Sequence, residues 1–170
     1  MPRPTLTNVP AFYHHYINQT KEEDVNETIR NNSKTAVAFF REIPEEKWTY
    51  RYADGKWSIK EMVQHIIDAD RIFSYRALCI ARGEKGSLPG FEENDYAAAS
   101  RADNRTSAEL INEFETLRNS IVQLFASFDD EQLASVGTAN GNPIAANAIG
   151  FIIAGHTQHH LNILKERYLA

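Results

Sequence analysis

The chain has 170 residues, 42% of them hydrophobic, which is enough to enclose the core of one domain. Its formal net charge is −5 and its 18 lysines and arginines are dispersed, so the composition argues against a nucleic-acid partner. No apolar run approaches the roughly 20 residues of a membrane-spanning helix. We therefore expect one domain over residues 1–170, with neither a membrane nor a nucleic acid as partner.

Two features predict a cytoplasmic location. The N-terminal MPRPTLTNVP lacks the apolar core of a signal peptide. The single cysteine, Cys79, cannot form an internal disulfide, which fits a reducing compartment.

The first third of the chain predicts two helices and a connector. A short leading helix is expected over residues 9–17, and a long amphipathic helix over residues 22–42. Proline and glycine then break the pattern. The aromatic residues Tyr50, Tyr52 and Trp57 either wall one end of a pocket or serve as core.

The next helix is predicted from residue 59 to about residue 82. It opens with a capping box, in which Ser58 bonds the backbone near Glu61 and Glu61 reaches back. His65 lies on the flank of its apolar stripe. Asp70 lies closer to the centre of that stripe and would need a cationic partner. The candidates are Arg71, Arg76 and Arg118.

Two long connectors enclose a third helix. Residues 84–105 exceed the usual length of a turn in a helical bundle, so this segment can cross the bundle and cover a pocket. A second capping box, Thr106 to Glu109, starts a helix with a regular apolar stripe to residue 128. The connector that follows is rich in Gly, Asn and Asp.

The last helix carries the most informative pattern in the chain. Asn142 is predicted as its N-cap and Pro143 as its first residue. At about 100° per residue, His156 and His160 share one stripe with isoleucines, so both imidazoles occupy core positions. Burying a polar ring without a partner costs roughly 1–3 kcal/mol. Either ordinary hydrogen bonds or a shared metal ion would remove that cost.

These elements predict an all-α fold: a four-helix bundle with a long crossover connection between helices 2 and 3 and a short N-terminal leading helix. Four motifs also carry a family resemblance. They are KWSIKEMVQHI (56–66), YRALCIARG (75–83), LPGFEENDY (88–96) and AGHTQHHLNILKERY (154–168). With these motifs the sequence resembles the DinB-like superfamily, which includes the YfiT-like metal-dependent hydrolases.

The resemblance implies a four-helix bundle that holds a divalent metal through His65 and the pair His156 and His160. It also implies a homodimer. Several branches of the superfamily transfer groups to or from low-molecular-weight thiols, and one member is an isomerase that uses such a thiol.

Three imidazoles suit zinc or nickel, with iron and manganese as further candidates, and they leave coordination positions open for water or substrate. The favoured function is S-transfer between a thiol cosubstrate and a small electrophile. The alternatives are a metal-dependent hydrolase, a non-catalytic metal-stabilised bundle for stress response or interaction, and a metal-free ligand-binding bundle.

The remaining candidates have supporting roles. His159 is predicted at the edge of the stripe, with a role beside the ligands or in a pocket rather than in ligation. Asp68 either orients an imidazole N–H or is a solvated carboxylate. His14 and His15 are expected at the surface or at an interface.

Overall fold

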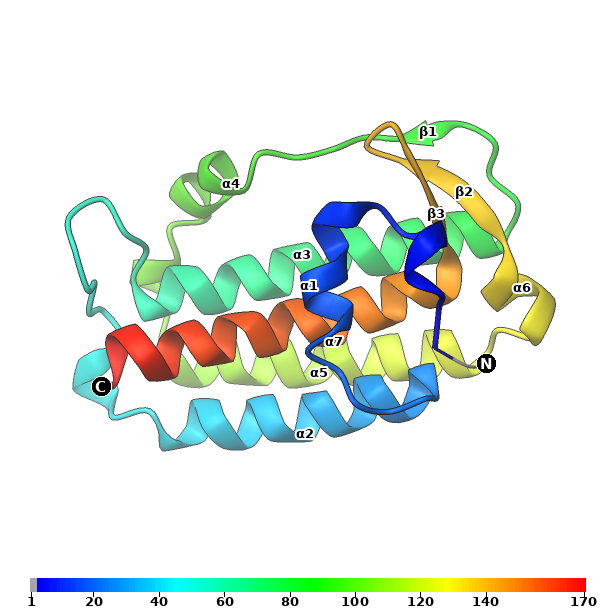
Figure 1. Ribbon diagram of the computed structural model, residues 1–170. Helices are drawn as coiled ribbons and strands as arrows, with labels where there is room; N and C mark the ends of the chain where they lie inside the picture. The colour runs from blue at the N-terminus through cyan, green and yellow to red at the C-terminus, as the bar shows by residue number, and fades with distance from the viewer. Residues whose placement is uncertain (1–2) are drawn as a thin grey trace.

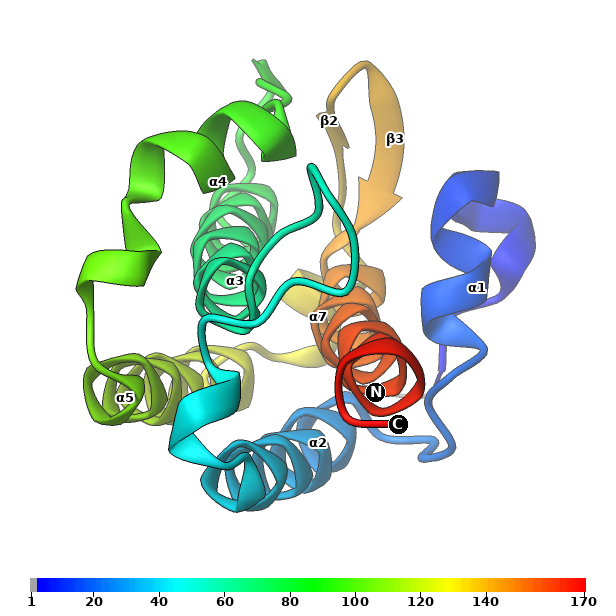
Figure 2. The same ribbon diagram turned by 90° about the vertical axis from the view of Figure 1, so that its left-hand side faces the viewer.

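A computed structural model describes residues 3–170, apart from the side chain of Asn8. Its four long helices are α2 (Val25–Glu42), α3 (Ile59–Ala81), α5 (Ser107–Ala126) and α7 (Ala146–Ile163). They lie side by side in Figure 1, and the end-on view of Figure 2 shows them in a ring. Helix α7 packs against α2 and α3, and α5 packs against the same two helices. The predicted four-helix bundle is confirmed.

The two capping boxes are present as predicted. The Ser58 side chain accepts a hydrogen bond from the Glu61 backbone and Glu61 reaches back, and Thr106 and Glu109 repeat the arrangement at α5. Each box satisfies backbone N–H groups that the first turn of a helix leaves without a partner. Within the described residues, no helix is both long and apolar enough to span a membrane.

The crossover connection follows from the directions of the helices. Figure 1 shows α3 and α5 running the same way, so the chain has to return along the bundle between them. That return contains β1 (Ser87–Leu88), α4 (Glu93–Ser100) and a short 3-10 turn (Ala102–Asn104). Helix α4 packs on α3. The predicted long connection is correct, but it contains regular structure that the sequence did not indicate.

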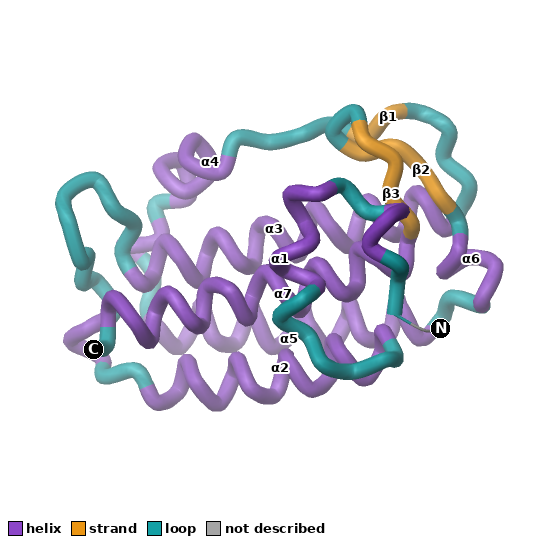
Figure 3. The backbone as a smooth tube through the Cα atoms, viewed as in Figure 1, coloured by secondary structure: helices purple, strands orange, loops and turns teal. Residues whose placement is uncertain are grey.

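A small sheet, drawn in orange in Figure 3, replaces the predicted start of the last helix. Strand β2 (Val136–Ala139) pairs antiparallel with β3 (Asn142–Ala145), and β1 pairs parallel with β2. The prediction of Asn142 as an N-cap and Pro143 as a first helical residue is therefore wrong. Asn140 and Gly141 take positive φ angles of 49° and 72°, as the two-residue turn of a hairpin requires. Helix α7 begins only after the hairpin.

The second connector also contains a helix that the sequence did not indicate. Asp129 is the N-cap of helix α6 (Asp130–Ala134), and its side chain forms a further capping box with Gln132. It leads directly into β2, so it places the hairpin at the end of the bundle where α3 ends and α7 begins (Figure 1).

The leading helix is shorter than predicted. Residues 9–17 hold a 3-10 turn (Ala11–Tyr13) and then the single-turn helix α1 (His14–Ile17), which packs on α7. The contact is close, because a Cβ atom on Gly155 would lie 2.0 Å from the carbonyl oxygen of Tyr16. A glycine at the position before His156 therefore lets α1 approach the helix that carries two of the candidate ligands.

Candidate metal centre

His65 comes from the second turn of α3. The capping box at Ser58 fixes the start of this helix, and the side chain of His65 points into the bundle with only 4% of its surface exposed. The ring of Trp57, the residue before the cap, lies 4.7 Å from the His65 ring between centroids. The sequence placed His65 at the edge of the apolar stripe, and the structure buries it.

His156 and His160 stand one turn apart on α7, with 5% and 7% of their surfaces exposed. The Nε2 atom of His156 lies 3.1 Å from Nε2 of His65 and 3.0 Å from Nε2 of His160. Each residue offers one ring nitrogen such that all three lie within 4.8 Å of one another. The structure thus brings together three residues that are up to 95 positions apart in the sequence.

Hydrogen bonds among the three rings cannot account for both short nitrogen–nitrogen contacts of His156. A neutral imidazole Nε2 carries either one hydrogen or one in-plane lone pair, so it makes one good hydrogen bond. Nε2 of His156 nevertheless faces two nitrogens at hydrogen-bond distance. In every neutral tautomer one of the two short contacts lacks a hydrogen bond. A cation placed between the three lone pairs would satisfy all of them.

Burial keeps the three rings neutral, which is the form that binds metals. Burial lowers the pKa of His65 from 6.5 to about 4. It also lowers the pKa of His156 and His160 well below 6.5, and for each the charge of a neighbouring histidine adds to the effect. Charging any of these imidazoles in the apolar interior costs free energy. The site therefore presents unprotonated nitrogens at neutral pH.

The second ring nitrogens of two of these histidines lack the hydrogen-bond partner that metal-binding histidines usually have. The buried Nδ1 atoms of His156 and His160 have no protein hydrogen-bond partner, although such groups normally donate to a carboxylate or carbonyl. Orienting an imidazole was one of two roles considered for Asp68, but its carboxylate accepts a hydrogen bond from Gln64 at 2.9 Å and lies 3.8 Å from Arg71. Asp68 therefore orients neither of these two rings, because a polar network on α3 and α5 engages it instead.

His159 lies beside the three histidines, as its place on the edge of the stripe suggested. Its half-buried ring packs 5.2 Å from the ring of His160 and 5.4 Å from those of His15 and Tyr16, between centroids. Burial lowers its pKa, with a further contribution from His15. Tyr16 also packs against His156, at 5.3 Å. No local pattern indicated that α1 lies at this site, since its position depends on packing against α7.

His14 and His15 are less uniformly exposed than predicted. His15 is exposed, whereas His14 is half-buried and its Nε2 lies 2.8 Å from the carbonyl oxygen of Val9. His15 therefore reaches the surroundings of the three histidines through its ring contacts, and His14 holds the N-terminal segment.

A pocket of about 220 Å³ opens beside His160. Its walls are Tyr52, Gly55, Lys56, Trp57, Met62, Asn94, His160, Ile163 and Tyr168. Tyr52 and Trp57 thus line the pocket, while Tyr50 is 41% exposed and packs on Tyr168. The Tyr168 hydroxyl donates to the Trp57 carbonyl at 2.8 Å, which ties the end of the chain to the pocket wall. Sequence analysis missed Asn94, because only the fold brings α4 to this opening.

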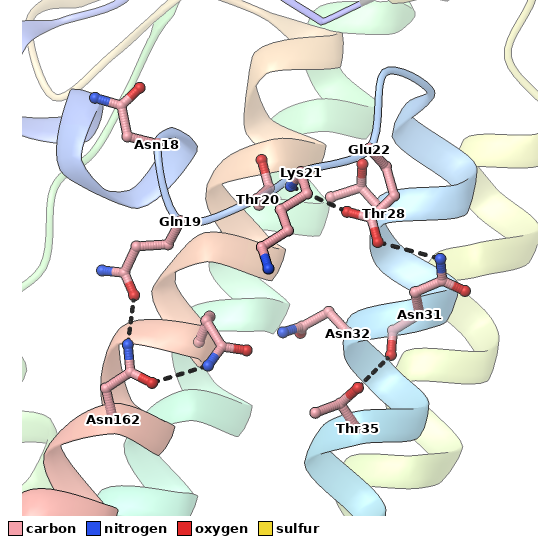
Figure 4. Close-up of a pocket in the computed structure, with 11 residues that line it drawn as sticks. Asn18, Gln19, Thr20, Lys21, Glu22, Thr28, Asn31, Asn32, Thr35 and Asn162 are labelled. Atoms are coloured by element: carbon pink, nitrogen blue, oxygen red, sulfur yellow. Dashed lines mark hydrogen bonds between the residues drawn. The ribbon is translucent and has the colours of Figure 1, made fainter.

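A larger pocket, of about 490 Å³, lies away from the three histidines. Figure 4 shows it between α7, α2 and the segment that joins α1 to α2. Amide side chains dominate its lining, and Asn162 donates to Gln19 at 3.0 Å across one side of it. None of its lining residues belongs to the triad of His65, His156 and His160.

The chain is similar to known proteins in sequence and in fold. A sequence model of the DinB superfamily matches residues 28–164. A relative from Oceanobacillus iheyensis, named "Putative metal-dependent hydrolase OB0413", is 27% identical over 126 residues, which cover 72% of this chain and 71% of the relative.

Two solved structures share the fold. YfiT from Bacillus subtilis, described as "a probable metal-dependent hydrolase with an unusual four-helix bundle topology", has a TM-score of 0.69 at 16% identity, over 98% of this chain and 90% of YfiT. A mycothiol-dependent maleylpyruvate isomerase has a TM-score of 0.67 at 11% identity, over 94% of this chain. This chain spans only 62% of the isomerase.

Proposed function

The chain belongs to the DinB superfamily, and we propose that it is a metal-dependent enzyme whose ion is held by His65, His156 and His160. The observation that carries the proposal is the convergence of three buried Nε2 atoms, two of the pairs at 3.0 and 3.1 Å. In a tetrahedral zinc site with Zn–N distances of about 2.0–2.1 Å, two ligand nitrogens are about 3.3 Å apart. These two pairs need to lengthen only slightly to reach that spacing.

The donor set favours zinc or nickel, with iron and manganese as the next candidates. Imidazole nitrogens suit borderline transition metals, whereas magnesium and calcium prefer oxygen ligands. Three protein ligands leave at least one position for a small molecule, the pattern of a catalytic site. A divalent ion held there would act as a Lewis acid that lowers the pKa of a bound water or thiol and polarises a carbonyl.

The residues around the ligands suit an apolar electrophile. Trp57, Tyr52 and Ile163 give the pocket apolar walls that exclude water and pack against a substrate, while Lys56 and Asn94 offer polar contacts at the same opening. The volume of about 220 Å³ limits the bound part of the substrate to a small molecule.

S-transfer from a low-molecular-weight thiol is the favoured reaction. The pocket lining contains no carboxylate, so it offers no acidic side chain to take a proton from an attacking water. A thiol ionises far more readily than water and depends less on such a base. The similarity of fold to an enzyme that is named as mycothiol-dependent supports the same choice.

Hydrolysis is the second candidate. It is favoured by the names of the relative from Oceanobacillus iheyensis and of YfiT. A hydrolase would need a proton acceptor, and the candidate is the imidazole of His159, whose ring lies 5.2 Å from that of His160. A non-catalytic metal-stabilised bundle is the third reading.

Metal content is the first test. Untagged, chelator-free protein should carry about one equivalent of transition metal per chain, and the His156→Ala variant almost none. His15→Ala is the matched control, because His15 is exposed and outside the triad, and it should keep its metal. Parent protein that cannot be loaded with any of the four metals would refute the proposal.

Activity assays on the loaded protein then separate the candidates. Conjugation of N-acetylcysteine to an unsaturated ketone, lost in His156→Ala, would support S-transfer. Hydrolysis of p-nitrophenyl acetate without conjugation would support a hydrolase. Metal-dependent stability with neither activity would support the non-catalytic bundle. The proposed homodimer is tested separately by light scattering in solution.

A further inference from the structure

Arg76 on α3 carries a buried charge without a counter-ion. Its side chain is only 4% exposed, and within residues 3–170 no carboxylate forms an ion pair with it. One guanidinium nitrogen, Nη2, donates to the carbonyl oxygen of Pro89 at 2.6 Å, while Nε has no hydrogen-bond partner. Buried charges are normally paired, because leaving one unpaired is costly. A bound anion would therefore neutralise the buried charge of Arg76.

The groups around Arg76 do not supply a negative charge. The Tyr13 hydroxyl makes a hydrogen bond with the guanidinium, but burial raises the pKa of Tyr13, so the phenol stays neutral. Phe73 offers the face of its ring at 5.8 Å, a weaker cation–π contact. The carboxylate of Glu113 is engaged by Arg71 at 2.6 Å.

Arg76 lines a pocket of about 250 Å³ between α3 and the segment 88–91, with Tyr96 of α4 completing it. Most of the lining is apolar, from Ile72, Leu88 and Phe91, and it contains no carboxylate. Tyr75 and Tyr96 also line it and are 57% and 48% exposed, unusually high values for large aromatic side chains. The Phe91 and Tyr96 rings pack edge to face at 5.2 Å. These apolar and aromatic walls would accommodate the flat apolar part of a ligand.

The segment that covers the pocket is anchored. Leu88 lies in β1, and its carbonyl oxygen accepts a hydrogen bond from the backbone of Asn140 at 2.9 Å. Gly90 lies so close to the Asn140 side chain that a Cβ atom there would be 2.5 Å from its Oδ1. The pocket is thus held open by the hairpin rather than by a loose loop.

We propose that this pocket binds a small organic acid with an aromatic or planar apolar body, whose carboxylate pairs with Arg76. The pocket lining contains none of the three histidines, and the Phe73 ring that Arg76 contacts lies 6.0 Å from the ring of His156. Binding in this pocket therefore requires no metal and does not depend on the proposed enzyme function. Glu92 and Asp95 line only the adjoining pocket.

Phenylacetate is the probe, with phenylacetamide as its neutral analogue and acetate as the anion without a ring. Backbone amide chemical shifts of the full-length protein, followed by NMR during titration, report both affinity and location. We expect phenylacetate to shift amides of residues 72–76 and 88–96 and to bind at least tenfold more tightly than either analogue. Chelator treatment should leave this binding unchanged.

Arg76→Met keeps the length of the side chain and removes its charge, and it should weaken phenylacetate binding at least tenfold. Arg82→Met is the matched control, since Arg82 caps the end of α3, lies over the Phe128 ring and does not line the pocket. If Arg76→Met does not fold, Tyr96→Ala removes an exposed wall and should weaken binding instead. Equal binding of phenylacetate and phenylacetamide, no binding at millimolar concentrations, or shifts confined to the triad would overturn the proposal.

Discussion

Asp70 on α3 and Arg118 on α5 form an ion pair in the centre of the bundle, with 2.6 Å between Oδ2 and Nε and exposed fractions of 0% and 1%. Arg118 also donates to the carbonyl oxygen of Ile153 at 3.2 Å and to the hydroxyl of Thr157. These two acceptors flank His156 on α7. The pair therefore links the helix of His65 to the helix of the other two candidate ligands.

Asp70→Asn should destabilise the protein by about 3–5 kcal/mol, because it leaves the Arg118 charge buried without its counter-ion. Urea denaturation measures the change. Arg41→Met is the control, since Arg41 and Glu115 form a 2.8 Å pair that is 61% and 43% exposed, and such pairs contribute about 0–1 kcal/mol. Equal effects of the two variants would contradict a structural role for the buried pair.

The metal-free protein should lose stability as the pH falls from about 6.5 toward 4. The folded pKa of His65 is lowered from 6.5 to about 4, so in this range the unfolded chain binds a proton that the folded chain does not. At pH 5 this one residue costs about 2 kcal/mol. His156 and His160, whose pKa values are also lowered, act in the same direction.

Asp70 opposes this trend. Burial outweighs the attraction of Arg118 and raises the pKa of Asp70 from 3.8 to about 6, so the folded chain binds the extra proton in that range and gains stability as the pH falls. Because three imidazoles destabilise the folded chain on acidification and one carboxylate stabilises it, the net result is a loss of stability. Urea midpoints at about pH 7 and pH 5 measure it, and His65→Gln should reduce the difference while the exposed His15→Gln should not. A stability that rises on acidification would show that the histidines are not buried as neutral rings.

Gly155→Ala should lower the free energy of unfolding by about 1–3 kcal/mol. The added methyl group would lie 2.0 Å from the Tyr16 carbonyl oxygen, a backbone atom that can move only with α1. Thermal denaturation measures the loss. Gly86→Ala is the control, because its methyl group would meet only the flexible end of Glu84 at 3.2 Å. An unchanged midpoint in Gly155→Ala would mean that α1 moves away from α7 at little cost.

Metal should stabilise the folded chain by mass action. A free zinc concentration 100 times the dissociation constant adds about 2.7 kcal/mol, which corresponds to a rise of several degrees in the melting temperature for a chain of this size. Differential scanning calorimetry with and without chelator measures the shift. His160→Ala should show no shift, and a zinc effect that survives in this variant would place the metal elsewhere.

The hairpin is a region where the sequence carries a turn signal, but the start of a helix was predicted instead. Asn140 and Gly141 are a strong signal for a two-residue turn, yet the four-residue strands beside it, Val136–Ala139 and Asn142–Ala145, are too short to show a clear alternation. Asn142 and Pro143 equally suit the start of a helix. Pairing with β1, from a segment some 50 residues earlier, is a tertiary contact that favours the strand.

Features that depend on neighbours a few residues away could be predicted from the sequence. The capping boxes at Ser58 and Thr106, the apolar stripes of the four long helices and the common face of His156 and His160 all follow from local hydrogen bonds and helical period. Tertiary structure alone decided how closely the helices approach. It brought His65 to within 3.1 Å of His156, engaged Asp68 away from the rings and left Arg76 buried without a counter-ion. These outcomes depend on side chains from distant segments filling the same space, and a local pattern does not encode that.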